Sequence, residues 1–292
     1  MKYRFVHQHP EHPVAKWAKL LYISRSGYYS WLEHKEERQK QEEIYEALVE
    51  SQFKESQGTY GAERICGALR NLGYTASFQK VKSIMKKRHL HSIHPPRKQH
   101  AITNSRSARD EECPNLVKKM EITKAFQVIT SDISYLKTTE GSQYICKIKD
   151  VASGTVLAQT ISDRMKADLV MTTIKTMLNR WKIPKGCIFH SDRGSQYRAE
   201  EVRKLLNQHG LLQSFSGRGK PGDNAWSESF FSILKKEMIH GKPRKSKSEL
   251  NQDLFIYTEG FYNTKRIQKR LGYLSPMEWL KQNQMSKLES VP

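Results

Sequence analysis

The hydrophobic pattern of the chain changes its period near residue 128, and this change restricts the possible folds more than any other feature. Three runs rich in β-branched residues follow one another at Val128–Leu136, Tyr144–Val151 and Thr155–Ile161. Runs of this length and composition predict three short strands. We expect these strands to form an antiparallel meander.

Helical and strand-like segments alternate after the meander. Apolar residues at helical spacing predict helices over Ala167–Trp181 and Ala199–His209. Short apolar runs predict strands at Cys187–His190 and Leu211–Phe215. Strands followed by alternating helix and strand indicate an α/β layer fold.

A glycine-rich segment follows the last predicted strand. Gly217–Gly222 contains three glycines and two basic residues, so we expect a loop without regular structure. Asp223 is placed to cap the next helix. Two more helices are expected after it, over Lys247 to about Asn263 and over Pro276–Gln282.

The N-terminal part of the chain has a helical pattern instead. Val14–Leu21 carries apolar positions at helical spacing, and Ser24–Gly27 supplies a turn and a serine N-cap for a helix that starts near Tyr28. This pair predicts a small helix-turn-helix. Trp31–Lys54 is the only long helix candidate, and it is a candidate for self-association.

A second helical pair is predicted from Gly61–Asn71 and from a helix that Ser77 caps and that ends near Arg88. Basic residues on the exposed faces of such helices would bind the phosphates of duplex DNA. An ordinary solvated helical hairpin fits the same spacing. The basic residues in question are Arg64, Arg70, Lys80, Lys82, Lys86, Lys87 and Arg88.

The segment Pro95–Cys113 contains Pro, Ser and Arg with little apolar periodicity, which indicates a basic linker. A domain boundary belongs there. The sequence therefore predicts an N-terminal helical, helix-turn-helix region (1–55), a second helical DNA-binding domain (56–93), a basic linker (94–124) and a core with C-terminal helices (125–284).

The overall charge points to the kind of partner. Fifty Lys and Arg stand against 30 Asp and Glu, a formal net charge of +20. Such a balance favours a polyanion. Nucleic acid is favoured over a membrane surface, because positive charge recurs along the whole chain and no apolar run approaches the roughly 20 residues that span a bilayer. Charge alone also fits a ribosomal or other scaffold protein.

Compartment and metal-site expectations follow from the first residues and from the cysteines. The first ten residues contain no apolar stretch followed by a small-residue cleavage site, so we expect a cytoplasmic protein. The four cysteines include no Cys-x-x-Cys pair, which argues against a disulfide framework and a zinc ribbon. They are Cys66, Cys113, Cys146 and Cys187.

Three carboxylates stand out by their position among 30 acidic residues. Asp132 interrupts an apolar strand, where an unpaired carboxylate is expensive unless a cation or hydrogen bonds compensate it. Asp192 ends a short apolar strand, at the strand edge where α/β folds place their sites. Glu228 lies on a helix just after the glycine-rich loop and is able to project back toward the sheet.

The surroundings of these carboxylates resemble a known catalytic core. Asp192 lies within His190–Tyr197, and Glu228 follows after 35 residues within Gly222–Phe231. Together with Asp132–Tyr135, these segments resemble the core of retroviral-type integrases and of bacterial insertion-sequence transposases. Two departures are that no Trp precedes the first aspartate and that Gly154 stands where an Arg is common.

The resemblance extends over nearly the whole chain. Tyr262–Arg266 and Leu271–Pro276 resemble the tail of the second reading frame product of two-frame insertion sequences. Ser24–Tyr29 and Gly58–Gly61 resemble the helical N-terminal region of the same proteins. Asp150 then corresponds to a structural residue of the second strand, outside the triad.

The resemblance implies both a fold and an activity. The fold is a ribonuclease H-like integrase core, a mixed five-stranded sheet with flanking helices, preceded by small all-α helix-turn-helix domains. The activity is that of a transposase, which cleaves DNA at the ends of an insertion sequence and joins the 3′-OH ends to target DNA. Asp132, Asp192 and Glu228 would be the catalytic residues and the metal ligands. Such hard oxygen donors suit two Mg²⁺ or Mn²⁺ ions.

Further residues receive roles from their position around the triad. Lys235 lies two helical turns after Glu228, where the resemblance implies a basic contact to the transposon end. Hydrogen bonding to the metal ligands or substrate is expected from His190, Asn224 and Gln196. Contacts with the DNA backbone are expected from Arg218, Lys220, Lys82, Lys86 and Lys87.

The expected partners are double-stranded DNA, namely terminal inverted repeats and target DNA, and further copies of the chain, at least as a dimer. Fusion to, or association with, the upstream frame product is also implied, in a bacterial cytoplasm with its nucleoid. Two alternatives stay open: a ribonuclease H-like nuclease that does not join ends, and an inactive DNA-binding regulator.

Overall fold

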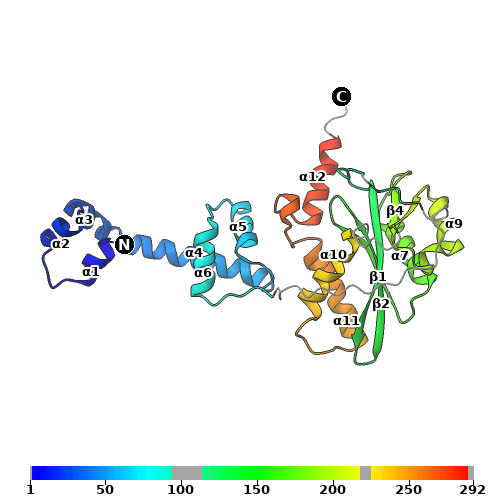
Figure 1. The fold of residues 1–292 in the computed structure, drawn as a ribbon, viewed down its shortest axis with the longest axis horizontal. Coiled ribbons are helices and arrows are strands. Elements are labelled where there is room, and N and C mark those ends of the chain that lie inside the picture. Colours follow the sequence, from blue (N-terminus) through cyan, green and yellow to red (C-terminus); the bar gives the residue numbers. More distant parts are fainter. Residues whose placement is uncertain (1, 94–113, 119, 218–224, 289–292) are drawn as a thin grey trace.

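The computed structural model describes residues 2–93, 114–118, 120–217 and 225–288, and of these it describes 225–228 and 284–288 by their backbone alone. Three parts follow one another along the long axis of the molecule (Figure 1). A lobe of three short helices lies at one end, a second helical unit lies in the middle, and the sheet with its helices forms the other end.

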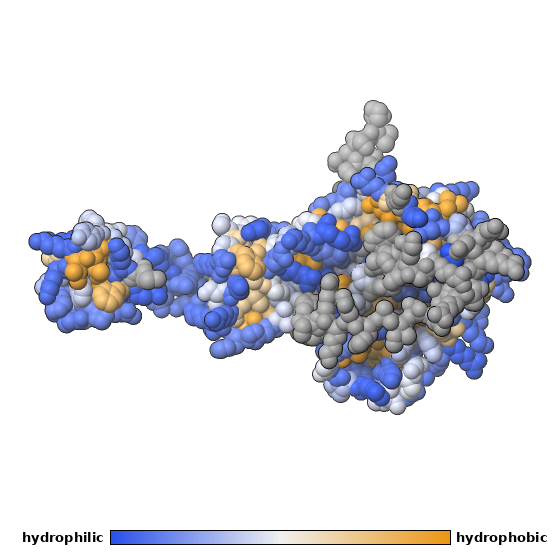
Figure 2. Space-filling model, in the orientation of Figure 1, coloured by the Kyte–Doolittle hydropathy of each residue, from blue (hydrophilic) through white to orange (hydrophobic). Residues whose placement is uncertain are grey.

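The N-terminal lobe consists of α1 (Lys2–Gln8), α2 (Val14–Leu21) and α3 (Arg25–Glu33). The Ser24 hydroxyl accepts a hydrogen bond from the Gly27 N–H at 3.2 Å, as an N-cap does. The expected start of α3 near Tyr28 is therefore wrong, because a cap at Ser24 makes Arg25 the first helical residue. Figure 2 shows an apolar patch on this lobe. The exposed large apolar side chains of α1 to α3 and the turns between them include Phe5, Leu20, Tyr22 and Tyr29.

The long helix expected over Trp31–Lys54 is wrong at its start. The chain turns at His34 (φ −91°, ψ 14°), so that α3 ends at Glu33 and α4 spans Lys35–Glu55. Trp31 stacks on Tyr28 in the N-terminal lobe, with ring centroids 6.1 Å apart. The far half of α4 packs into a different core, that of the middle unit, through the fully buried Val49. Packing against two bodies explains the turn.

The middle unit combines α4 with α5 (Ala62–Asn71) and α6 (Phe78–Lys87), and both of the latter helices were expected. The Ser77 hydroxyl accepts from the Lys80 N–H at 3.2 Å, which confirms the predicted cap of α6. Val81 on α6 is completely buried against α4 and α5.

The sheet has five strands in the order β3-β2-β1-β4-β5. β1 (Val128–Thr138), β2 (Gly141–Asp150) and β3 (Val156–Ser162) are antiparallel, which confirms the expected meander. β4 (Ile188–Ser191) and β5 (Leu212–Phe215) add to β1 in parallel, so the sheet is mixed.

Helices cover both faces of this sheet (Figure 1). α7 (Ala167–Arg180), α8 (Ser195–Arg198) and α9 (Glu200–Gln208) bury one face. α10 (Ala225–Leu234) and α11 (Lys247–Phe255) bury the other. The α/β layer fold predicted from the alternating pattern is confirmed.

Both helices of the second face continue as wider, π-helical turns. π-helical turns extend α10 over Lys235–Ile239 and α11 over Ile256–Tyr262. The helix expected up to about Asn263 is thus helical throughout but not α-helical throughout. A 3₁₀ turn at Lys269–Leu271 and α12 (Pro276–Leu288) follow.

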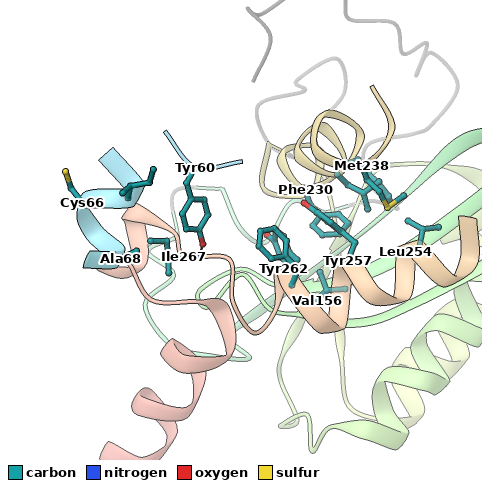
Figure 3. Packing of buried hydrophobic residues seen from close by; sticks show 14 of the residues in the cluster. Tyr60, Cys66, Ala68, Val156, Phe230, Met238, Leu254, Tyr257, Tyr262 and Ile267 are labelled. Carbon is teal, nitrogen blue, oxygen red and sulfur yellow. Dashed lines mark hydrogen bonds between the residues drawn. The ribbon is translucent and has the colours of Figure 1, made fainter. Parts of the chain in front are cut away.

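The middle unit is attached to the segment after the second π-helical turn. The Tyr60 hydroxyl donates to the Lys265 carbonyl at 3.1 Å and accepts from the Ile267 N–H at 2.9 Å. Figure 3 shows Tyr60 and Ile267 side by side at this junction, with Ala68 of α5 close by. The Asn71 side-chain amide donates to the Tyr273 carbonyl at 2.8 Å. Within the described ranges, no helix is long and apolar enough to span a membrane.

Candidate active site

Two of the predicted carboxylates lie on adjacent parallel strands, with Asp132 inside β1 and Asp192 directly after the end of β4. The parallel ladder between β1 and β4 ends with the pair Thr130 and His190. Asp132 and Asp192 each follow this pair by two residues. Equal steps beyond a parallel pair favour the same face of the sheet, and the charges of both aspartates act on the same Tyr197 hydroxyl. The fold thus unites two residues that are far apart in sequence.

Each aspartate accepts a hydrogen bond from a nearby backbone N–H. Asp132 Oδ1 accepts from Ile133 at 2.9 Å, and Asp192 Oδ1 accepts from Gly194 at 3.0 Å. Burial raises the pKa of Asp192, and the Gly194 hydrogen bond lowers it only in part. A partly buried carboxylate with a raised pKa gains stability from a nearby cation. The pair therefore has the chemistry of a cation site.

Tyr197 on α8 lies on the opposite face, beneath the two aspartates. Its hydroxyl is hydrogen-bonded to the Ser131 hydroxyl at 3.0 Å, and its ring is 1% exposed. Burial raises the pKa of Tyr197, and the negative charges of Asp132 and Asp192 raise it further. This phenol is therefore within electrostatic reach of both carboxylates. It fixes α8, and with it the turn after Asp192, to β1.

Glu228 lies in the first turn of α10, and its side chain is outside the described ones. The helix packs on the face of the sheet to which Asp132 points, because Lys147, directly opposite Asp132 on β2, contacts Phe230 and Phe231 of α10. No group of three His, Cys, Asp or Glu suited to a metal occurs among the side chains that are described. The complete triad remains a prediction.

Two lysines lie in the electrostatic field of Asp132. Lys235 is half-buried, with its ammonium group 5.5 Å from the centre of the Tyr135 ring. Burial lowers the pKa of Lys235, and the charge of Asp132 opposes this effect. Lys235 was expected beside the triad, and the structure places it close to Asp132. The second lysine, Lys147, is fully buried.

The predicted supporting residues lie around Asp192. A Cβ atom on Gly194 would lie 2.7 Å from Gln196 Oε1 and 3.0 Å from Asp192 Oδ1, so these two side chains share one side of the turn. His190 is completely buried, and its Nδ1 is hydrogen-bonded to the Ser214 hydroxyl at 2.9 Å. That bond connects β4 to β5 next to Asp192.

The remaining expected DNA contacts lie elsewhere. Arg218, Lys220 and Asn224 are outside the described residues. Lys82, Lys86 and Lys87 are exposed on α6, in the middle unit and not in the sheet domain. Of these, Lys87 is ion-paired with the buried Glu46.

Sequence reasoning missed two residues near the candidate site. Tyr197 lies within the motif around Asp192, but nothing in the pattern distinguished it from other core tyrosines. Lys147 carried a weak signal, since it is a lysine within the largely apolar predicted strand Tyr144–Val151, and only the structure shows that it is buried. A charge at such a position is costly and indicates a role.

Three family models match successive parts of the chain. Residues 122–221 and 228–283 each match a model described as integrase core domain, and residues 39–99 match a model described as HTH-like domain. The first core model includes Asp132, Asp192 and most of the glycine-rich segment, and the second begins at Glu228.

Curated bacterial transposases are similar along most of the chain. The transposase for insertion sequence element IS904 from Lactococcus lactis is 32% identical and covers 84% of this chain and 97% of its own length. Transposase InsF for insertion sequence IS3A from Escherichia coli is 31% identical and covers 97% of this chain and 99% of its own length.

Solved structures with a similar fold include viral integrases. A simian T-cell lymphotropic virus intasome chain is 16% identical with a TM-score of 0.44, over 73% of this chain and 69% of its own. The HTLV-2 integrase catalytic core domain, solved in complex with magnesium, is 11% identical with a TM-score of 0.37, over 53% of this chain and 96% of its own.

Proposed function

The chain belongs to the insertion-sequence transposases with an integrase core domain, and from this premise we propose that Asp132, Asp192 and Glu228 are its catalytic carboxylates. A transposase of this family acts on DNA. The observation that carries the proposal is the matching position of Asp132 and Asp192, each two residues beyond the last paired residue of two adjacent parallel strands, on the face that α10 covers.

The residues present fit divalent cations. Carboxylate oxygens are the donors that Mg²⁺ and Mn²⁺ prefer, and the burial that raises the pKa of Asp192 favours a compensating cation. We place two ions among Asp132, Asp192 and Glu228. When bound, they activate the attacking oxygen and stabilise the leaving 3′ oxygen of the scissile phosphate.

The task of the protein is to position these groups. Two adjacent strands hold the aspartates, while Tyr197 and His190 hold these strands from the opposite face and from β5. Water as the attacking group gives a nicked 3′-OH end. The same 3′-OH as the attacking group gives strand transfer, so one site serves both steps.

Basic side chains hold the DNA in this proposal. Lys235 lies close to Asp132 and contacts the DNA near the transposon end, together with Arg218 and Lys220 of the glycine-rich loop. Lys82 and Lys86 on the exposed face of α6 bind the backbone farther away. Lys87 is ion-paired with Glu46, which partly neutralises its charge, so its contribution to DNA binding is smaller.

The proposal also assigns domains and partners. We keep the division into 1–55, 56–93, 94–124 and 125–284, with the second segment as a DNA-binding unit. Gln196, His190 and Asn224 support the carboxylates or the substrate. Bringing together two transposon ends requires at least a dimer, and the upstream frame product is a further partner, as a fusion or a separate chain.

An oligonucleotide assay with magnesium tests the chemistry. We expect the wild-type chain to nick a duplex that carries the terminal repeat and to join the 3′-OH end to a second duplex. Asp192→Asn is expected to bind DNA normally yet lose both steps by about a thousandfold or more, because a metal ligand is lost. Asp168→Asn, at an exposed position on α7, is the control and is expected to retain both.

Other outcomes would point to other functions. Cleavage without joining would indicate a nuclease of the same fold, and binding without chemistry would indicate a DNA-binding regulator. Cleavage by Asp192→Asn at the wild-type rate would contradict the triad.

A further inference from the structure

Lys147 lies on β2 directly opposite Asp132 on β1. Residues that face each other in an antiparallel pair project from the same side of the sheet, with Cβ atoms about 5 Å apart. The Lys147 side chain is 0% exposed, and its ammonium nitrogen has no hydrogen-bond partner within the described part of the chain. A buried ammonium group of this kind is rare, because desolvation costs several kcal/mol.

Two aromatic rings of α10 surround the Lys147 ammonium group. It lies 5.3 Å from the ring centres of both Phe230 and Phe231, which follow closely after Glu228 in the same helix. Figure 3 shows Phe230 beside Tyr262 in the packed core beneath α10, and their ring centres are 4.8 Å apart. Cation–π contacts with these two rings offset only part of the cost of burying the charge.

The negative charge of Asp132 offsets a further part of this cost. Burial lowers the pKa of Lys147 to about 8, and the attraction to Asp132 keeps it from falling further. Lys149, two residues along the same strand and on the same face, is buried next to Asp150 and not next to Asp132. The position opposite the catalytic aspartate therefore distinguishes Lys147 from its neighbour.

We propose that Lys147 is a positioning residue that serves as a fixed counter-ion of Asp132 and thereby sets how tightly the site binds divalent cations. Before metal enters, the Lys147 ammonium group offsets the negative charge of Asp132 and keeps α10 packed through Phe230 and Phe231. Each entering cation meets the repulsion of this fixed positive charge. This inference rests on the proposed metal site.

Direct metal titration of the full chain tests the inference. Binding of Mn²⁺ alone, followed by the electron paramagnetic resonance signal of the free ion, reports affinity without catalysis. Lys147→Met removes the charge at similar volume, and we expect the Mn²⁺ dissociation constant to fall by about tenfold. If Lys147 had only a structural role, its replacement would weaken Mn²⁺ binding. The direction of the change in the dissociation constant therefore distinguishes the two roles.

Lys149→Met is the matched control, since it removes another buried lysine, 5% exposed against 0% for Lys147, from the same strand and face. Its Mn²⁺ affinity is expected to stay near that of the wild type. If circular dichroism shows that Lys147→Met does not fold, Lys147→Gln carries the same expectation. Unchanged or weaker Mn²⁺ binding in a folded neutral variant, or equal tightening in Lys149→Met, overturns the inference.

Asp132→Asn separates this inference from the proposed function. We expect this variant to lose most Mn²⁺ binding. Retained binding would show that the proposed metal site is wrong. Lost binding in Asp132→Asn combined with no tightening in Lys147→Met would leave the metal site intact and refute the role of Lys147 alone.

Discussion

Glu237 and Arg266 form an ion pair that water hardly reaches. Their side chains are 1% and 2% exposed, and Arg266 Nη2 lies 2.7 Å from Glu237 Oε1. The Tyr257 hydroxyl donates a further hydrogen bond to Glu237 at 2.7 Å. Since every group has a partner, the cost of burying the two charges is compensated within the core. The pair connects the π-helical turn after α10 to the segment that holds the middle unit.

Breaking this pair should be strongly destabilising. We predict that Glu237→Gln lowers the free energy of unfolding by about 3–5 kcal/mol, because the guanidinium of Arg266 remains buried without a counter-charge. Urea denaturation followed by circular dichroism measures the loss. Glu259→Gln, which removes an exposed ion pair with Arg180, is the control and should cost less than about 1 kcal/mol. Equal losses in both variants would argue against the buried pair.

At the scale of elements, α6 is held on α4 by one buried carboxylate. Glu46 is 2% exposed and is paired with Lys87 and Arg88 at the end of α6. The hydrogen bond from Lys87 lowers the pKa of Glu46 below its ordinary value of 4.5. A lowered carboxyl pKa means that the ionised form stabilises the fold.

The sign of this shift gives a pH dependence. The contribution of Glu46 is complete above pH 4.5 and is lost as the pH falls through the lower pKa of the folded state. We predict that Glu46→Gln melts about 5 °C below the wild type at pH 7 and that the difference shrinks below about pH 4.5. Melting curves over this pH range check it, with the exposed Glu43→Gln as the control. A difference that is independent of pH would refute the pairing.

At the scale of the whole molecule, the middle helical unit and the sheet domain share one hydrophobic cluster, to which the Tyr60 hydroxyl adds polar contacts. The buried Tyr60 hydroxyl both donates to Lys265 and accepts from Ile267, so it satisfies two backbone groups of the other part. A hydroxyl with two such partners fixes the orientation of the exposed α6 helix relative to the face that carries Asp132. This orientation matters if one DNA molecule contacts both parts.

Tyr60→Phe tests the junction with the loss of a single oxygen atom. We predict that this change lowers the free energy of unfolding by about 1–3 kcal/mol, because the Ile267 N–H is left buried without an acceptor. Calorimetry should show the helical unit and the sheet domain beginning to unfold separately. Tyr74→Phe, at an exposed position in the same unit, is the control and should leave one transition. An unchanged transition in Tyr60→Phe would mean that the hydroxyl does not hold the junction.

The sequence by itself determined the types of the elements and the identity of the candidate site. A period of two along β1 and β2 and a helical period along α7 reflect which face of each element is buried, and that information is local. Residue spacing and motifs around Asp192 and Glu228 identified the family, which the comparisons confirm. The sequence also predicted a helix end where the capping residue is adjacent in sequence, as at Ser77.

The tertiary structure alone decided the features that depend on contacts between distant segments. The turn at His34 exists because α3 and α4 pack into different cores, although the pattern of both is helical. The parallel pairing of β1 and β4 brings together the segments that carry Asp132 and Asp192. The pairing of β1 with β2 places Lys147 opposite Asp132, and the packing of α10 brings two aromatic rings to the Lys147 ammonium group. Period and composition predict which face of an element a residue occupies. They do not predict which charge or ring that residue meets, because this group belongs to another part of the chain.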